Sequence, residues 1–371
     1  MLLASVSLLA LAVSNVSEGT GDNVNEAEFG IFCTLLNTLD AEDIENVATE
    51  GLDQKANTAY TEIEHMFIMT SNESYYNEGP ANSPDSTGTI KPKTEADISQ
   101  WKNERKVWEE TPYPGDPSKK KYTRKDRSLL PKQLGDKLDR SFARATKIKS
   151  EIQSTAQAIE QKEKEIRTAL RQALCGWHRP GDATPKPKPV AADFENTYAA
   201  ACYGTSGPGK RLANDLVCLC SASASTSTEN NKQCTDNTIL TDTTNYGTSA
   251  TALTRFTTLQ QACKKVYQTY KVSAAALKGL TTAFMARLGH HSLSSASDLG
   301  SYTYGKGQDS TNACNGGAAD GKSCVNYATL VKASSGTALD KAVAWLKEIG
   351  AAETAVLARF TLIKKKQSKR G

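Results

Sequence analysis

The chain of 371 residues is poor in the side chains and motifs that catalysis and membrane insertion require. It has only four histidines, and it contains neither a G-x-S-x-G nor an H-E-x-x-H motif. Beyond residue 13 no stretch is long and apolar enough to cross a bilayer as a helix. Hydrophobic residues make up 38%, a low share for a compact globule, so we expect an elongated shape with helices that largely face water.

Sites for metals and phosphates are also missing from the sequence. The four histidines do not have metal-ligand spacing with the cysteines; they are His65, His178, His290 and His291. The loop GTSGPGK, Gly204–Lys210, matches G-x-x-x-x-G-K, but Arg211 stands where a phosphate-binding loop needs Ser or Thr to hold magnesium. We therefore predict no catalytic residue, no cofactor and no metal site, and expect a non-enzymatic protein.

Charge gives no support to a nucleic-acid partner. The formal net charge is +4, and no sequence signature of a nucleic-acid-binding domain is present. Basic residues gather in two short runs, Lys119–Arg127 and Lys364–Arg370, which we interpret as solvated surface. We predict that the protein does not bind nucleic acid.

The N-terminus resembles a secretory signal. Residues 1–14, MLLASVSLLALAVS, combine a short apolar run with small residues at its end, although no Lys or Arg precedes the run. A secreted chain folds where thiols oxidise, so its cysteines are expected to form disulfides. Asn72-Glu-Ser74 is then an acceptor site for N-glycosylation. The alternative interpretation of residues 1–14 is a buried N-terminal segment.

The chain has nine cysteines, and disulfide formation is the chemistry that we expect of them. Cys218-x-Cys220 followed by Cys234 lacks a fourth zinc ligand, and C-x-C is not the C-x-x-C spacing of a redox pair. We expect these cysteines to connect one loop to two places, and Cys314 and Cys324 to close a glycine-rich loop. The number is odd, so one cysteine is free or pairs outside the chain. The disulfide candidates are Cys33, Cys175, Cys202, Cys218, Cys220, Cys234, Cys263, Cys314 and Cys324.

Hydrophobic periodicity predicts four helical segments separated by long polar stretches. The first begins after Asn25, a candidate N-cap, and continues with an interruption to about residue 70. The second, residues 131–174, contains no further proline and repeats apolar residues every seven positions, which requires a partner helix. The third and fourth span residues 252–288 and 337–366. The fold class is thus all-α, with antiparallel long helices in a hairpin or coiled-coil bundle and disulfide-stapled loop lobes.

The order of these features resembles the N-terminal domain of B-type variant surface glycoproteins of trypanosomes. The features are a signal followed by NEAEFGIFCTLL, a long charged helix ending in ALRQALCGW, the loop NDLVCLC…CT, and ALDKAVAWLKEIG. The resemblance runs from about Asn25 to Phe360. It implies a signal peptide (1–14), the glycoprotein domain (15–366) and a basic tail (367–371).

The resemblance also implies a function and a set of partners. Proteins of this family form a surface coat on the outer face of the plasma membrane that shields the parasite, and they mediate antigenic variation and evasion of host antibody. They dimerise along their long helices and are held by a glycosylphosphatidylinositol (GPI) anchor. The cysteine-rich C-terminal domain and the anchor signal of the family are absent from the sequence. Two alternatives are a transferrin-type nutrient receptor subunit on the same fold, and a truncated or pseudogene coat fragment.

Overall fold

The structure is a computed structural model, and it describes most of the chain. The described residues are 23–46, 52–80, 93–176, 188–223, 233–235, 239–240, 244–291, 302–306, 314–316, 323–333 and 338–368. The chain divides into two compact units. Unit 1 comprises residues 1–46 and 159–361, and unit 2 comprises residues 47–158 and 362–371. The predicted signal at residues 1–14, His178, Thr337 and residues 369–371 of the basic tail lie outside the described residues.

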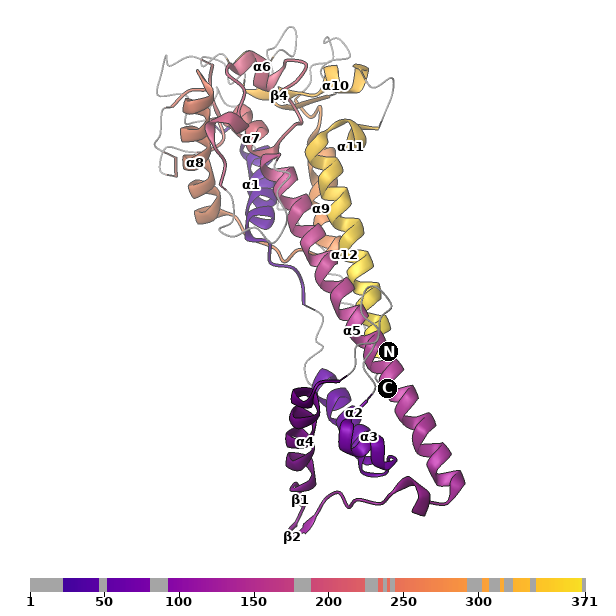
Figure 1. The fold of residues 1–371 in the computed structure, drawn as a ribbon. Helices are drawn as coiled ribbons and strands as arrows, with labels where there is room; N and C mark the ends of the chain where they lie inside the picture. The colour runs from indigo at the N-terminus through magenta and orange to yellow at the C-terminus, as the bar shows by residue number, and fades with distance from the viewer. Residues whose placement is uncertain are drawn as a thin grey trace. The chain divides into compact units, whose positions relative to one another are not determined.

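The described chain is largely helical, which confirms the predicted all-α class (Figure 1). The helices of unit 1 are α1 (Glu26–Ala41), α6 (Tyr198–Cys202), α7 (Leu212–Cys220), α8 (Ser249–Val266), α9 (Ala274–Arg287), α10 (Ala328–Ala333) and α11 (Leu339–Ala342). Unit 2 holds α2 (Leu52–Met69), α3 (Glu73–Glu78) and α4 (Glu95–Glu109). Helices α5 (Lys132–Cys175) and α12 (Ala344–Ser368) contribute residues to both units. The strands are β1 (Pro112–Tyr113), β2 (Asp116–Lys120), β3 (Thr303–Gly305) and β4 (Cys324–Asn326), paired antiparallel as β1–β2 and β3–β4.

Helix α1 lies at the centre of unit 1, in contact with α7, α8 and α9. Its apolar residues surround the helix rather than forming one stripe, as expected of a helix enclosed by other elements. Phe32 is fully buried, and its ring stacks on Tyr304 of β3 with centroids 4.6 Å apart. Phe284 of α9 stacks on Phe32 and meets Trp345 of α12 edge-on. This aromatic group joins α1, α9, α12 and the β3–β4 pair.

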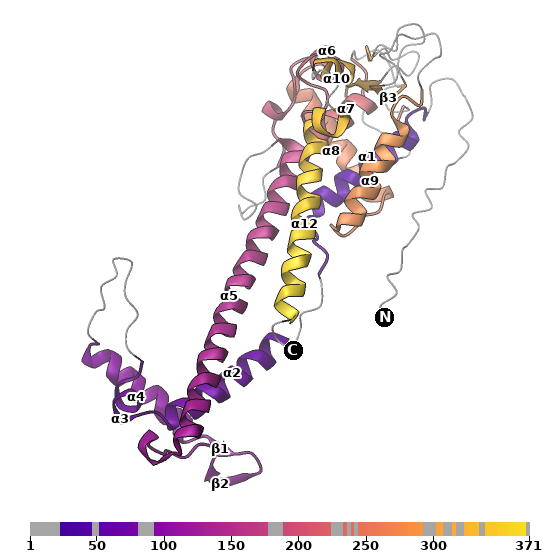
Figure 2. The same ribbon diagram turned by 90° about the vertical axis from the view of Figure 1, so that its right-hand side faces the viewer.

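The long predicted helix is confirmed almost to the residue, because α5 spans Lys132–Cys175. In unit 1 it runs beside and antiparallel to α12 (Figures 1 and 2). The seven-residue row explains this contact, since Ile166 and Ala173 are fully buried, as is Ile349 of α12. The guanidinium of Arg359 in α12 joins the two helices through a 2.9 Å bond from its Nε to Glu163 of α5.

The prediction of one helix over residues 252–288 is wrong. Helix α8 ends at Val266 and α9 begins at Ala274, with an extended backbone at Tyr267. Val272 pairs with Ile44 across a single β-bridge, and its N–H donates to the Asp43 carbonyl at 2.7 Å. Ser273 then caps α9 by accepting the Ala276 N–H. The pairing with residues 43–45 is a long-range contact that periodicity cannot reveal.

The fourth segment is helical as predicted, with one difference near its start. The extended residue Val343 separates α11 from α12. Asn25 precedes α1 as predicted, but its side chain makes no capping hydrogen bond.

Residues 71–127, a long polar stretch in which periodicity predicts no helix, belong to unit 2. This stretch contains α3, α4 and the β1–β2 pair. Stacked rings supply much of the packing. The ring centroids of Phe67 and of Phe142 in α5 are 4.1 Å apart, and those of His65 and of Trp108 in α4 are 4.4 Å apart. The guanidinium groups of Arg105 and Arg124 both lie over the ring of Tyr76. Residues 47–158 and 362–371 contain no cysteine, so unit 2 folds without a disulfide.

Candidate functional site

Four disulfides connect segments of unit 1 to one another. Cys33 of α1 bonds to Cys263 of α8, and Cys202 of α6 bonds to Cys218 of α7. Two residues further along α7, Cys220 bonds to Cys234, so this short segment is held at two places. Cys314 bonds to Cys324 at the start of β4. The ninth cysteine, Cys175 at the end of α5, is buried and lies outside these four disulfides.

Asn25 holds several of the same loops without a covalent bond. Its fully buried Nδ2 donates to the carbonyls of Leu219 and Ser323, at 3.0 and 2.7 Å. Its Oδ1 accepts the N–H of Lys306 at 2.8 Å, and its own N–H donates to the carbonyl of Gln233. The side chain therefore satisfies main-chain groups from three segments, and the N–H of the same residue binds a fourth. These bonds replace the capping role predicted for the side chain.

Asp215 is the second polar centre of this region and is fully buried in α7. Its Oδ2 accepts hydrogen bonds of 2.8 Å from Tyr327 Oη and from Trp345 Nε1. Burial raises the pKa of its carboxyl to about 7, although the donors from Tyr327, Trp345 and Gly209 act in the opposite direction. A carboxyl in this setting is a structural acceptor, since its lone pairs are used by groups from three separate segments.

The loop that matches a phosphate-binding pattern serves this carboxyl. The N–H of Gly209 donates to both oxygens of Asp215, at 3.0 and 3.1 Å. Gly209 has a φ of +73°, and a Cβ there would lie 2.8 Å from Leu330 Cδ1, so glycine is needed for conformation and for space. The segment before the loop is the short helix α6 and not a strand. The N–H of Gly209 therefore already donates to the carboxylate of Asp215 within the same chain.

A charged group lies in the first turn of α1. Glu28 is fully buried, and its Oε1 lies 2.6 Å from Arg287 Nη2 and 3.2 Å from His291 Nε2. Burial raises the pKa of Glu28, but the hydrogen bond and charge of His291 and the charge of Arg287 outweigh it, and the net pKa is lowered. Of the two adjacent histidines, His291 therefore has a partner in the core, while His290 is exposed.

The other predicted positions lie in unit 2 or on surfaces. Asn72 is exposed at the start of α3, where its Oδ1 accepts the N–H of Tyr75 at 2.8 Å. His65 is buried against the rings of Trp108 and Tyr122. In the first basic run, Lys121 pairs with Glu62 at 2.7 Å and Lys119 pairs with Asp116 at 3.0 Å. This run is ion-paired surface, in agreement with the prediction.

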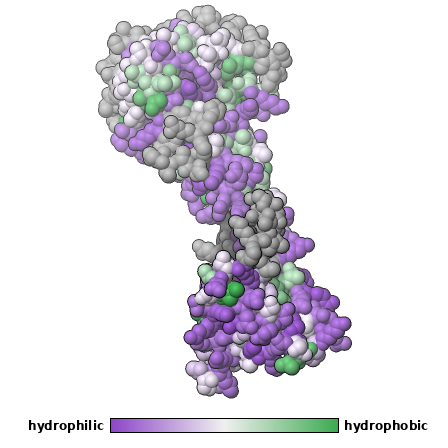
Figure 3. Space-filling view, viewed as in Figure 1, coloured by the Kyte–Doolittle hydropathy of each residue, from purple (hydrophilic) through white to green (hydrophobic). Residues whose placement is uncertain are grey.

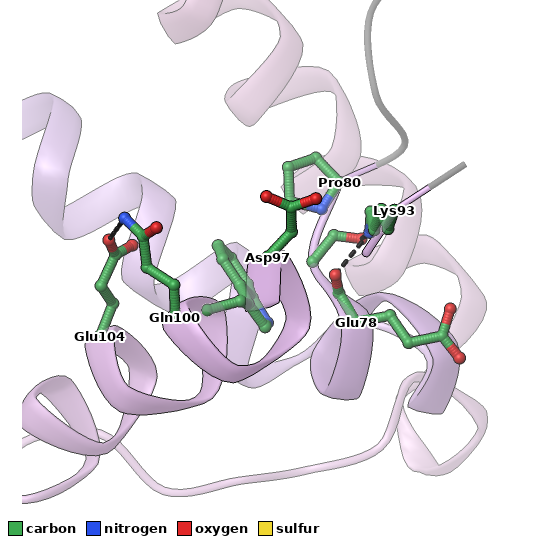
Figure 4. A pocket seen from close by; sticks show the side chains of 8 residues that line it. Glu78, Pro80, Lys93, Asp97, Gln100 and Glu104 are labelled. Atoms are coloured by element: carbon green, nitrogen blue, oxygen red, sulfur yellow. Dashed lines mark hydrogen bonds between the residues drawn. The ribbon is translucent and has the colours of Figure 1, made fainter. Parts of the chain in front are cut away.

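One face of the described residues is largely polar (Figure 3), and a small hollow lies in unit 2. On the face drawn in Figure 3, hydrophilic residues predominate among the described residues and hydrophobic ones are scattered. One hollow in unit 2, with a volume of about 190 Å³, lies between the end of α3 and α4 (Figure 4). Among the described residues, no group of three or more His, Cys, Asp or Glu side chains is arranged to hold a metal ion. The helices of that same portion include none with the length and apolarity to cross a membrane.

Comparison with known proteins decides the family. The family model described as "Trypanosomal VSG domain" matches residues 7–370 of the chain. The chain belongs to the trypanosomal variant surface glycoprotein family. It is also 36% identical, over 365 residues, to variant surface glycoprotein WRATAT B of Trypanosoma brucei rhodesiense. That alignment covers 98% of this chain and 74% of the relative.

Membership of the variant surface glycoprotein family confirms the resemblance drawn from the sequence and gives the function. The protein is a surface coat glycoprotein. The comparisons favour this role over the nutrient receptor subunit that the sequence left open. They also agree with a family of structural coat proteins.

Proposed function

We propose that this coat protein acts as a homodimer that shields the cell surface and presents the disulfide-linked loops of unit 1 to host antibody. The observation that supports the dimer is an exposed stripe on α12, on the side opposite the buried residues Ile349 and Ala352. The stripe recurs at helical spacing and consists of Lys347, Gly350, Ala351, Thr354, Leu357 and Thr361.

The composition of this stripe suits a second helix. Gly350 has no atom within 4 Å of the position that a Cβ would occupy, so another backbone could approach closely there. Leu357 is 53% exposed, which is unusual for a leucine on a long helix with an otherwise polar surface. A second copy of the same helix would cover Leu357 and the small residues around it, consistent with the two-fold symmetry of most dimers.

Sedimentation of the purified protein tests the dimer. Leu357→Glu would place a charge in the centre of the interface and should weaken dimerisation by about tenfold or more. The matched control is Leu129→Glu in unit 2, because Leu129 is 77% exposed and lies outside the stripe. If both variants sediment like the wild type, the stripe on α12 is not the dimer interface.

The family and the disulfides support a location on the cell surface. Disulfides persist in secreted and surface proteins, so the four in unit 1 support entry into the secretory route and residence on the outer face of the plasma membrane. Attachment would be through the GPI anchor of the family, and Asn72 would carry an N-glycan. Antibody labelling of intact cells tests this: a coat protein covers the whole surface, whereas a few copies in one membrane pocket would contradict the proposal.

A further inference from the structure

The hollow in unit 2 combines an aromatic side chain with several exposed polar groups. It is lined by Glu78, Gly79, Pro80, Lys93, Asp97, Gln100, Trp101 and Glu104. Figure 4 shows Gln100 and Glu104 together at one end, Lys93 and Glu78 at the other, and Asp97 between them. Its volume of about 190 Å³ is below that of pockets for drug-sized ligands, which begin near about 300 Å³. An occupant is therefore no larger than about one sugar ring.

The walls of the hollow are held in position by bonds within unit 2. Trp101 Nε1 donates to the carbonyl of Tyr76 at 3.0 Å, which fixes the indole beside the end of α3. Lys93 Nζ donates to the carbonyl of Gly79 at 2.7 Å. Gly79 has a φ of +78°, and a Cβ at this position would lie 2.8 Å from Trp101 Cδ2, so the main chain lies directly on the indole. The hollow is thus pre-formed.

The polar groups around the hollow are mostly acceptors for hydroxyl groups. Asp97, Gln100 and Glu104 are all exposed and lie on one face of α4. The Gln100 amide donates to Glu104 at 3.0 Å, which keeps both side chains at the rim. Carboxylates accept hydrogen bonds from several hydroxyls at once, and the part of the Trp101 indole that lines the hollow offers apolar surface to a sugar ring. This set of groups fits a neutral polyol better than an anion.

A sugar is predicted within reach of this hollow. Asn72, the N-glycosylation acceptor, begins the same short helix whose last residue, Glu78, lines the hollow. Six helical residues span about 9 Å, close to the length of two sugar rings. The Asn72 Oδ1 is engaged by the Tyr75 N–H, which leaves the Nδ2 atom, where a glycan attaches, outside that bond.

We propose that the hollow between α3 and α4 is a docking site for the N-glycan carried by Asn72 of the same chain. The inference rests on the proposed glycosylation of a secreted coat protein. The glycan core would fold back along α3, place one N-acetylhexosamine ring in the hollow, and hydrogen-bond to Asp97, Gln100 and Glu104.

Tethering explains how such a small, open site can be occupied. A ligand attached through a short linker has an effective concentration on the order of millimolar, so a millimolar intrinsic affinity is enough to populate the bound state. A site of this affinity would be nearly empty with free sugar at micromolar concentration. The docked glycan would cover α4, and the cover would be lost together with the glycan.

The first arm of the test asks only whether the glycan is present. The full chain is expressed in eukaryotic cells, and the peptide containing Asn72 is analysed by mass spectrometry before and after N-glycosidase digestion. An unmodified Asn72 would contradict both the glycosylation in the proposed function and the docking. A modified Asn72 establishes the glycosylation whatever the outcome of the docking arm.

The second arm measures docking as protection of the glycan. The rate at which an endoglycosidase removes the glycan from the native protein is compared between the wild type and Gln100→Ala/Glu104→Ala. If the wild-type glycan is docked for most of the time, the variant should be cleaved about threefold faster or more. Lys102→Ala is the matched control, because Lys102 is exposed on the opposite face of the same helix, and its rate should equal that of the wild type. Equal rates in all three proteins would overturn docking.

A third measurement guards against misfolding and identifies the source of the sugar. Hydrogen exchange of α4 in the wild type should speed up after the glycan is removed, and in Gln100→Ala/Glu104→Ala it should not change on removal.

Asn72→Gln, which has no glycan of its own, is then titrated with chitobiose and followed by NMR. Shifts confined to Gln100, Trp101 and Glu104 at millimolar sugar support the site. Protection that returns at micromolar concentrations of a separate glycoprotein would instead assign the hollow to a glycan from another chain.

Discussion

Trp345 Nε1 donates a 2.8 Å hydrogen bond to Asp215 Oδ2 at a point where both side chains are fully excluded from water. The bond joins the start of α12 to α7, 130 residues earlier in the sequence. Tyr327 and Gly209 complete the set of donors around the carboxylate. The start of α12 is therefore positioned by a buried carboxyl whose pKa is raised to about 7, and we expect the stability of unit 1 to depend on pH.

Asp215→Asn should change the pH dependence of unfolding in unit 1. The pKa of Asp215 is raised from 3.8 to about 7 by burial, so the folded state binds a proton that the unfolded state has lost. This contribution to stability is fully present below about pH 4 and is lost as the pH rises through about 7. The wild type should lose about 1.4 kcal/mol per pH unit from this group across that range, and the variant should lack this slope.

Urea denaturation at a series of pH values from 5 to 8 measures this effect. The difference in unfolding free energy between the wild type and Asp215→Asn isolates the group from all other titrations. Asp340→Asn provides the control, since Asp340 is exposed in α11. A difference that stays constant with pH would show that Asp215 is ionised in the folded state throughout.

His65 should give unit 2 a pH dependence of stability with the opposite sign, and His65→Phe should remove it. Burial against Trp108 and Tyr122 lowers the pKa of His65 below 6.5, Lys121 adds to this, and Glu64 and Glu62 oppose it. A lowered histidine pKa gives stability that is present above about pH 6.5 and is lost as the pH falls through the folded-state value. Phenylalanine keeps the stacking and removes the titration, so unit 2 should become less sensitive to acid.

Hydrogen exchange of α2 and α4 at pH 7.5 and 5.0 reports on this directly. In the wild type, exchange corrected for its intrinsic pH dependence should become faster in acid, and in His65→Phe it should change much less. His290→Phe in unit 1 serves for comparison, because His290 is exposed. Equal acid sensitivity in the wild type and in His65→Phe would mean that other groups control unit 2.

Removal of Cys33–Cys263 should destabilise unit 1 more than removal of Cys314–Cys324. The first disulfide joins residues 230 positions apart and the second joins residues 10 positions apart, and the entropy removed from the unfolded chain grows with this separation. Replacing both cysteines of the first pair by serine should cost about 2–5 kcal/mol, and the second pair somewhat less.

Unit 2 gives this experiment an internal reference, because it contains no cysteine. Hydrogen exchange should accelerate in α1 and α8 of the Cys33→Ser/Cys263→Ser protein and stay unchanged in α2 and α4. Acceleration in both units to the same extent would show that they unfold together.

The sequence predicted the long helices because their signal is local. Residues 131–174 show an uninterrupted seven-residue period, and α5 follows it closely. The break between α8 and α9 escaped prediction because Val272 leaves the helix to pair with Ile44, more than 200 residues away. The elements of residues 71–127 in unit 2 were missed for a different reason. Its packing depends on rings such as Phe67 and Trp108, spaced widely among charged residues, and this composition has no simple period.

The candidate site was only partly predictable. The sequence indicated that the cysteines are crosslinks and that Cys314 and Cys324 are partners, but not the pairing of Cys33 with Cys263. Spacing restricts partners only when the loop between them is short. The role of Asp215 had no signal at all, since an isolated Asp in NDLVCLC reads as an ordinary helix residue. Its partner Gly209 was visible only as part of a misleading phosphate-loop pattern.

The contacts of Asn25 have an evolutionary consequence. Its side-chain amide binds main-chain groups of residues 219, 306 and 323, and its own N–H binds the carbonyl of residue 233. None of these bonds involves a side chain of those four residues. Every amino acid supplies a main-chain carbonyl, and every amino acid except proline supplies an N–H. Substitutions along those segments, other than to proline at residue 306, therefore preserve these bonds, so the same polypeptide path can carry a changed sequence.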